Sequence, residues 1–102
     1  MYRLEYLPIA RRDMVEIARY ISHELCNPIA AKTLAEEMLE KAEKLTETPY
    51  LNAIYICDRP LQHEYRKLIV QNYIMFYWVD EKEKMITIAR VVYARRDYAR
   101  LM

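Results

Sequence analysis

The chain has 102 residues, with no glycine, four prolines, 16 Lys and Arg residues and 15 Asp and Glu residues. This length suits one domain, residues 1–102, with a single modest core, and the 54% hydrophobic and 30% charged composition is typical of a globular protein. The absence of glycine excludes the Walker A loop, the dinucleotide-binding GxGxxG motif and the GxSxG elbow of serine hydrolases.

The sequence predicts neither a membrane segment nor a metal site. No apolar stretch approaches the roughly 20 residues that cross a bilayer, and the N-terminus does not resemble a signal peptide. Cys26, Cys57, His23 and His63 are scattered, without the spacing of a zinc site. We therefore expect a cytoplasmic protein with reduced cysteines and no cofactor or metal.

Charge is distributed unevenly along the chain. Residues 1–58 carry seven basic and ten acidic side chains, a net charge of −3, whereas residues 59–102 carry nine and five, a net charge of +4. The basic excess is greatest near the C-terminus, at Arg90, Arg95, Arg96 and Arg100, opposed there by Asp97. Such a patch could bind phosphates or an acidic protein partner. Alternatively, these arginines are solvent-exposed charges at the end of the chain without a binding role.

The first half of the chain predicts one strand and two helices. Residues 2–6 alternate large and charged side chains, as a half-buried strand does, and Pro8 suits the first turn of a helix. A helical apolar stripe follows, formed by Met14, Ile17, Ala18, Ile21 and Leu25.

The second helix is expected to start at Asn27 as N-cap, with Pro28 at the first helical position. Glu37 with Lys41 and Glu40 with Lys44 form favourable pairs on its outer face. Its apolar stripe comprises Ala31, Leu34, Ala35, Met38, Ala42 and Leu45. The short break predicts an antiparallel helical hairpin.

The second half predicts three strands after a loop at residues 49–60. Residues 65–70, 73–79 and 85–93 are rich in β-branched and aromatic side chains. Gln71 and Asn72 suit a tight turn, with Asn72 the better residue for a positive φ. The middle strand lacks polar alternation, which indicates burial on both faces. We predict an α+β domain in which the helical hairpin packs on one face of an antiparallel sheet.

Four segments of the chain resemble the RelE/ParE toxins of bacterial type II toxin–antitoxin pairs. They are residues 13–21 (DMVEIARYI), residues 27–31 (NPIAA), residues 65–68 (YRKL) leading to residues 72–77 (NYIMFY), and residues 90–97 (RVVYARRD). They occur in the family's order and span nearly the whole chain. The resemblance implies the β-α-α-β-β-β fold of that family and a cognate antitoxin as partner.

The resemblance also implies one of two targets. RelE-like members cut messenger RNA in the ribosomal A site, whereas ParE-like members poison DNA gyrase and cut nothing. A third possibility is an inert module whose role is to bind a DNA-binding antitoxin. Such a module would be harmless when expressed alone.

If the protein is a nuclease, the resemblance implies catalytic roles for Lys67, Arg95 and Tyr98. Lys67 best matches a lysine that faces the substrate in RelE-like nucleases, and Arg95 lies where the family places a second cation. Tyr98 could be a general base or a stacking ring. His63 and Glu64 are weaker acid–base candidates. Each of these residues also suits an ordinary structural or solvated position.

One departure from the nuclease pattern favours the ParE-like alternative. RelE-like nucleases carry an arginine directly after the aromatic residue that Tyr73 resembles, and this chain has Ile74 there. Arg66, Arg90 and the Arg95-Arg96-Asp97 ending are also closer to the ParE pattern. We therefore expect a gyrase-directed, non-nucleolytic toxin whose target-binding residues are Arg66, Arg90, Arg95 and Arg96.

Overall fold

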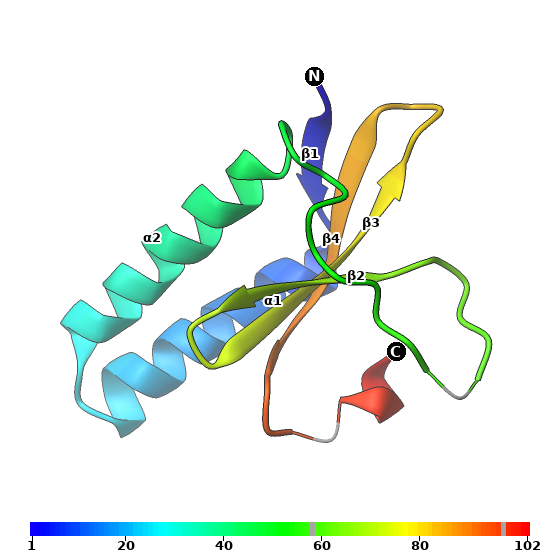
Figure 1. Ribbon diagram of the computed structural model, residues 1–102. Helices are drawn as coiled ribbons and strands as arrows, with labels where there is room; N and C mark the ends of the chain where they lie inside the picture. The colour runs from blue at the N-terminus through cyan, green and yellow to red at the C-terminus, as the bar shows by residue number, and fades with distance from the viewer. Residues whose placement is uncertain (58, 97) are drawn as a thin grey trace.

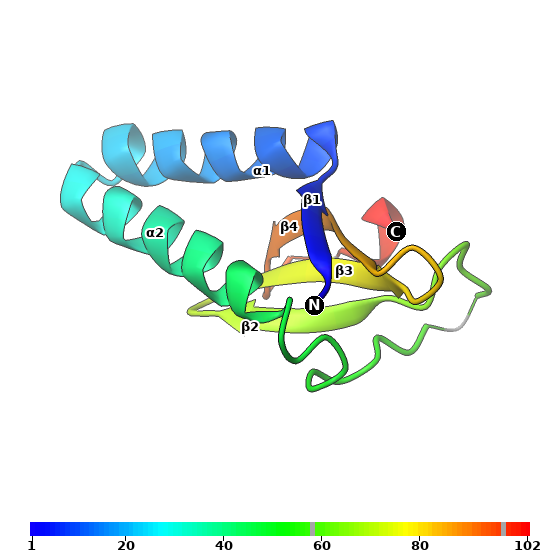
Figure 2. The same ribbon diagram turned by 90° about the horizontal axis from the view of Figure 1, so that it is seen from above.

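The computed structural model describes residues 1–57, 59–96 and 98–102 (Figure 1). The elements are β1 (Arg3–Tyr6), α1 (Pro8–Arg19), a π-helical turn η1 (Tyr20–Glu24), α2 (Pro28–Lys44), β2 (Arg66–Val70), β3 (Tyr73–Asp80), β4 (Met85–Tyr93) and a short 3₁₀ turn η2 (Ala99–Leu101). The two long helices form a hairpin on one side of the sheet (Figure 2). This arrangement confirms the predicted α+β fold.

The sheet is mixed, and the prediction of a purely antiparallel sheet was wrong. Its strand order is β1-β4-β3-β2, in which β1 runs parallel to β4 and the other neighbours are antiparallel. Leu4 lies opposite Ile86, at the start of β4. A side-chain pattern identifies the buried face of a strand but not its neighbour. A parallel neighbour also requires a long crossover, which the helical hairpin supplies here.

The turn between β2 and β3 also differs from the prediction in one detail. The positive φ of 53° belongs to Gln71, not to Asn72. The Gln71 side chain donates a hydrogen bond to Glu37 of α2, with 3.1 Å between Nε2 and Oε1. This contact links the turn to the helical hairpin across 34 residues of sequence.

The predicted first helix contains a change of helical type. After α1, the amide of Leu25 donates to the carbonyl of Tyr20, which is the wider π spacing, and Cys26 has a φ of 51°. Asn27 then caps α2 as predicted, because its Oδ1 accepts from the amide of Ala30 at 3.1 Å. The π turn thus ends one helix and positions the next.

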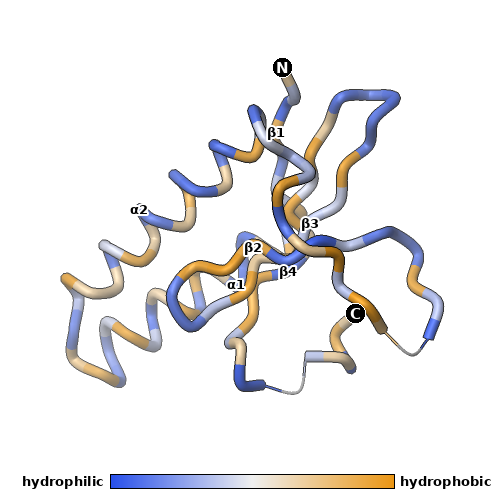
Figure 3. Tube along the Cα trace, in the orientation of Figure 1, coloured by the Kyte–Doolittle hydropathy of each residue, from blue (hydrophilic) through white to orange (hydrophobic). Residues whose placement is uncertain are grey.

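The outer face of α2 carries the two predicted ion pairs. Lys41 lies 3.3 Å from Glu37, and Lys44 lies 3.5 Å from Glu40. On the inner face, the predicted stripe is buried against the sheet at Ala31, Leu34, Met38, Ala42 and Leu45. The hydrophobic positions of the helices and strands are visible along the chain in Figure 3.

The core has two parts, one on each face of β3. Tyr77 belongs to the main core between the helical hairpin and the sheet. Phe76 belongs to a second cluster on the opposite face, with Ile74 and Val92. Tyr55, Tyr65, Tyr98, Leu101 and Met102 pack around this second cluster. The central strand is therefore covered on both faces, as its sequence predicted.

Candidate functional site: a groove and two sheet faces

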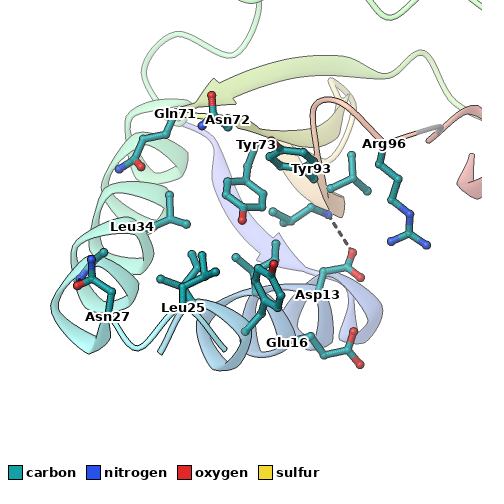
Figure 4. Close-up of a pocket in the computed structure, with 16 residues that line it drawn as sticks. Asp13, Glu16, Leu25, Asn27, Leu34, Gln71, Asn72, Tyr73, Tyr93 and Arg96 are labelled. Atoms are coloured by element: carbon teal, nitrogen blue, oxygen red, sulfur yellow. Dashed lines mark hydrogen bonds between the residues drawn. The ribbon is translucent and has the colours of Figure 1, made fainter. Parts of the chain in front are cut away.

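A groove of about 710 Å³ lies between the helical hairpin and one end of the sheet (Figure 4). Its walls come from α1, η1, the start of α2, the β2–β3 turn and the end of β4. The lining is mainly apolar and aromatic and includes Ile17, Tyr20, Leu25, Leu34, Tyr73 and Tyr93. The π turn contributes directly to this groove, because Tyr20 and Ile21 line the groove wall together with Leu25, the residue that follows the turn.

Asp13 closes one end of the groove by binding β4 from α1. Its Oδ2 accepts from Arg90 Nε at 2.8 Å and from the amide of Val91 at 2.9 Å, and its Oδ1 accepts from Arg90 Nη2 at 3.1 Å. The side chains of Asp13 and Arg90 are only 11% and 18% exposed. Arg90, which the sequence proposed as a target-binding residue, therefore has a partner within the fold.

One edge of β4 is open along this groove. β1 pairs only with residues 85–88, and the amide of Leu7 donates to the carbonyl of Ile88 as β1 ends. In the part of the chain that the structure describes, no strand pairs with this edge beyond Ile88, and Asp13 takes the amide of Val91. An unpaired strand edge is a template for an added strand.

Aromatic and charged side chains complete the groove. The rings of Tyr73 and Tyr93 meet edge to face, with 5.6 Å between their centroids. Burial raises the pKa of Tyr73 above its ordinary value. Arg96 and Glu16 are exposed lining residues, and Figure 4 shows them on different walls. The groove thus combines an apolar lining with a charged rim.

Arg66 and Lys67 point to opposite faces of β2, as their adjacency predicted. Arg66 is 15% exposed, and its Nη1 donates to the carbonyl of Asn52 at 2.7 Å and to that of Tyr50 at 3.3 Å. Its guanidinium also lies 5.0 Å from the centre of the Tyr50 ring. Arg66 therefore holds the loop before β2, a contact that its sequence position did not reveal.

Lys67 and Tyr98 lie on the face opposite the helices. Lys67 is opposite Phe76 in the β2–β3 ladder. The ring of Tyr98 packs against Phe76, at 5.3 Å between centroids, and against Tyr55, at 5.9 Å. Arg95 is exposed in the turn that follows β4. A nuclease mechanism would use Lys67, Arg95 and Tyr98. Of these three, Tyr98 packs within an apolar cluster.

The two histidines have different surroundings. His63 stacks on Trp78 with 3.7 Å between centroids and nearly parallel rings, and Tyr65 meets Trp78 edge to face. Glu64 lies 3.7 Å from Arg66. His23 is exposed in η1. The sequence suggests His63 as a possible acid or base. In the structure an aromatic contact with Trp78 accounts for its position.

Both cysteines are free thiols. The amide of Arg59 is the main cause that lowers the pKa of Cys57. Among residues 1–57, 59–96 and 98–102, no group of three or more His, Cys, Asp or Glu side chains could hold a metal ion. Asp97, the final residue of the fourth family segment, lies outside the described residues. No helix in the described chain is long and apolar enough to cross a membrane.

Comparisons with known proteins agree with this architecture. A chromosomal ParDE toxin–antitoxin system from P. aeruginosa matches with a TM-score of 0.74 and 20% identity, over 93% of this chain and 98% of that chain. The RelBE2 complex from Mycobacterium tuberculosis matches with a TM-score of 0.64 and 19% identity, over 90% and 96%. The intact RelBE complex from E. coli matches with a TM-score of 0.63 and 19% identity, over 94% and 100%.

These structural similarities establish the shared fold. A search of curated protein sequences finds no significant match. The sequence profile of the ParE toxin of the type II toxin–antitoxin system, parDE, matches residues 4–98, which include every long helix and strand except the first residue of β1. The chain therefore belongs to the ParE toxin family of type II toxin–antitoxin systems.

Proposed function

We propose that this ParE-family toxin acts on DNA gyrase and does not cleave RNA. The family profile supports this target, and the ParDE structure has a higher TM-score than the two RelBE complexes. The strongest support comes from the sheet face opposite the helices, because the buried side chains at its centre are apolar.

RNA cleavage without a metal requires a group that accepts the 2′-hydroxyl proton, cations near the phosphorane and a donor to the leaving oxygen. In this chain Ile74, Phe76 and Val92 are buried side by side on that face, and Tyr98 packs its ring on them. Aliphatic and phenyl groups cannot stabilise a developing negative charge. Loss of one preorganised donor alone typically lowers a rate about 10²–10³-fold.

The RelE-like alternative, a ribosome-dependent mRNA endonuclease, has one observation in its favour. Lys67 and Tyr98 come from distant parts of the sequence to the same face of the sheet, where both neighbour Phe76. The inert-module alternative predicts normal growth when the protein is expressed without a partner. Growth inhibition on expression alone would exclude it.

The partner that we propose is a cognate antitoxin bound along the groove. The M. tuberculosis and E. coli neighbours are toxin–antitoxin complexes, and the groove offers an apolar lining beside an open edge of β4. Peptides recognise such surfaces by laying an apolar helix face in a groove or by adding a strand. The basic excess after residue 58 favours an acidic segment.

This mode of binding predicts salt-sensitive association with the antitoxin. Affinity should decrease between about 50 mM and 500 mM salt, because exposed charge pairs are screened over roughly 10 Å at 0.1 M. Calorimetric titration at several salt concentrations measures the effect. An affinity that does not change with salt would remove the electrostatic part of the proposal.

Arg95 and Arg96 are the strongest candidates for contact with the target. Both are exposed in the turn beyond β4, where substitutions usually change stability by less than about 0.5 kcal/mol. An Arg95→Ala, Arg96→Ala double variant should keep the melting temperature but lose growth inhibition. Full toxicity of the double variant would show that these arginines are solvated charges without a role.

A further inference from the structure

The loop of residues 49–57, which we call the 49–57 loop, is held to the sheet by hydrogen bonds and carries three exposed aliphatic side chains. It runs beside the outer edge of β2 and is green in Figure 2. Leu51 is 79% exposed, Ile54 is 42% exposed and Ile56 is 87% exposed. Figure 3 shows hydrophobic stretches along this irregular connection between α2 and β2. A single exposed aliphatic residue is ordinary, but three within six residues need an explanation.

The exposure of these residues does not result from a loosely held loop. The buried Tyr77 donates its hydroxyl hydrogen to the carbonyl of Pro49 at 2.8 Å and accepts from Asn52 Nδ2 at 3.3 Å. Arg66 binds the carbonyls of Tyr50 and Asn52, as described above. Two long side chains from the sheet therefore fix the first half of the loop.

The second half of the loop is fixed by backbone pairing with β2. The amide of Tyr55 donates to the carbonyl of Tyr65 at 2.8 Å, and the amide of Lys67 donates to that of Ala53 at 3.0 Å. The Tyr55 ring points into the second core cluster, 5.1 Å from Phe76. In an extended segment alternate side chains point to opposite sides, so Ile54 and Ile56 are directed away from that cluster.

A preorganised surface of this kind suits a protein partner. Fixing a loop before binding removes the entropic cost of ordering it, and projecting side chains that fill a partner's pocket contribute most of the affinity. Aliphatic side chains can neither stack on bases nor pair with phosphates, which disfavours nucleic acid. The loop is also separate from the groove, because none of its residues lines that groove.

The charges around the loop define the partner further. Among the described residues, Glu64 pairs with Arg66, and Glu81, which accepts from Tyr50, pairs with Lys84. Arg59 and Lys67 are the cations beside the loop that no described carboxylate pairs. Arg59 is exposed, and its Nη2 donates to the carbonyl of Ala99, a contact that keeps its charge. The complementary surface is an apolar pocket bordered by carboxylates.

We propose that the 49–57 loop is a docking surface for the toxin's protein target, with Leu51 and Ile56 as its apolar anchors for an acidic-rimmed pocket. This inference rests on the proposed function, because it assumes a protein target rather than RNA. It places the apolar anchors for the target outside the antitoxin groove, whereas Arg96, a proposed target contact, lies on the rim of that groove.

The test compares a Leu51→Ser, Ile56→Ser double variant with a matched Ile29→Ser, Leu39→Ser control. Ile29 and Leu39 are exposed apolar residues of α2. Each protein is expressed without partner and scored for growth inhibition. The purified proteins are compared in melting temperature and in affinity for the co-encoded antitoxin. Loss of one interface anchor typically weakens binding about tenfold or more.

We expect the loop variant to need at least about tenfold more protein for the same growth inhibition, with unchanged melting and antitoxin affinity. The control should remain toxic. Full toxicity of the loop variant overturns the inference, as does a parallel loss of stability or of antitoxin binding. RNA cleavage that depends on Lys67 and is unaffected by the loop variant would also overturn it. A wild-type protein without toxicity refutes the proposed function itself and the inference with it.

A second pair of variants tests the charge of the partner separately. Ile56→Glu places a carboxylate where carboxylates are expected on the partner, whereas Ile56→Lys adds a complementary charge. Ile56→Glu should therefore reduce toxicity more than Ile56→Lys. The opposite order would contradict an acidic rim.

Discussion

At the scale of single residues, Glu81 joins three segments that lie far apart in the sequence. Its carboxylate accepts hydrogen bonds from Tyr2 and Tyr50, each at 2.6 Å, and from Lys84. Hydrogen bonds from Lys84, Tyr2 and Tyr50 lower the pKa of Glu81 to about 2, and the same carboxylate raises the pKa of Tyr50 to about 12. The ionised form of Glu81 is therefore the one that the folded state prefers.

This preference predicts a window of acid sensitivity. The folded pKa is below the ordinary value of 4.5, so the contribution of Glu81 to stability is complete above about pH 4.5 and is lost as the pH falls toward 2. A Glu81→Gln variant should therefore lose less stability than the wild type over that range. Urea midpoints measured from pH 7 to pH 2 test this.

Glu83→Gln is the matched control for Glu81→Gln, since it makes the same charge change in the same hairpin turn and leaves the three hydrogen bonds intact. Its acid profile should resemble that of the wild type. Identical profiles for Glu81→Gln and the wild type would show that the hydrogen-bonded cluster does not form in solution.

The basic residues show how far a sequence can assign roles. The sequence alone does not distinguish the four candidate arginines, Arg66, Arg90, Arg95 and Arg96. In the structure Arg66 binds loop carbonyls and Arg90 binds Asp13, whereas Arg95 and Arg96 remain exposed. The partner of Arg90 is 77 residues away in sequence. No local pattern marks such a contact, so only the fold separates structural from available cations.

At the scale of elements, most helices and strands were predictable because their patterns are local. Asn27 and Pro28 mark the start of α2, and the turn at Gln71 separates two β-rich runs. The direction of β1 was not predictable, because four residues with one alternating face fit either a parallel or an antiparallel neighbour. The π turn at η1 was hidden as well, because the sequence continues the helical apolar spacing to Leu25, which the structure leaves 56% exposed.

The Asp13–Arg90 pair predicts how strongly α1 is held to β4. Removing one partner of a buried ion pair typically costs about 3–5 kcal/mol, because it leaves an uncompensated charge. Asp13→Ala should lower stability on this scale and also free the amide of Val91. Urea unfolding gives the value.

Glu40→Ala is the comparison for Asp13→Ala, because its pair with Lys44 is exposed and such pairs contribute about 0.3–0.5 kcal/mol. Equal effects of the two substitutions would contradict a buried pair at α1 and β4. A much larger effect of Asp13→Ala would confirm that this pair positions one wall of the groove.

At the scale of the whole molecule, the domain presents three separate surfaces. The groove lies between the hairpin and the open edge of β4, the second core cluster covers the opposite sheet face, and the 49–57 loop borders β2. The candidate residues of the sequence could be identified by family resemblance. Their grouping could not be predicted, because the strand register places Lys67 opposite Phe76 and the packing of the chain's last residues brings Tyr98 to the same Phe76.

We propose that this toxin acts on DNA gyrase and does not cut RNA. The most direct measurement adds purified protein, at equal concentrations, to a gyrase supercoiling reaction and to ribosomes translating a defined messenger RNA. The apolar cluster around Ile74 and Phe76 predicts intact RNA, and the proposed ParE-type target predicts inhibited supercoiling. Ribosome-dependent cleavage of the messenger RNA, with supercoiling unaffected, would contradict the proposed function.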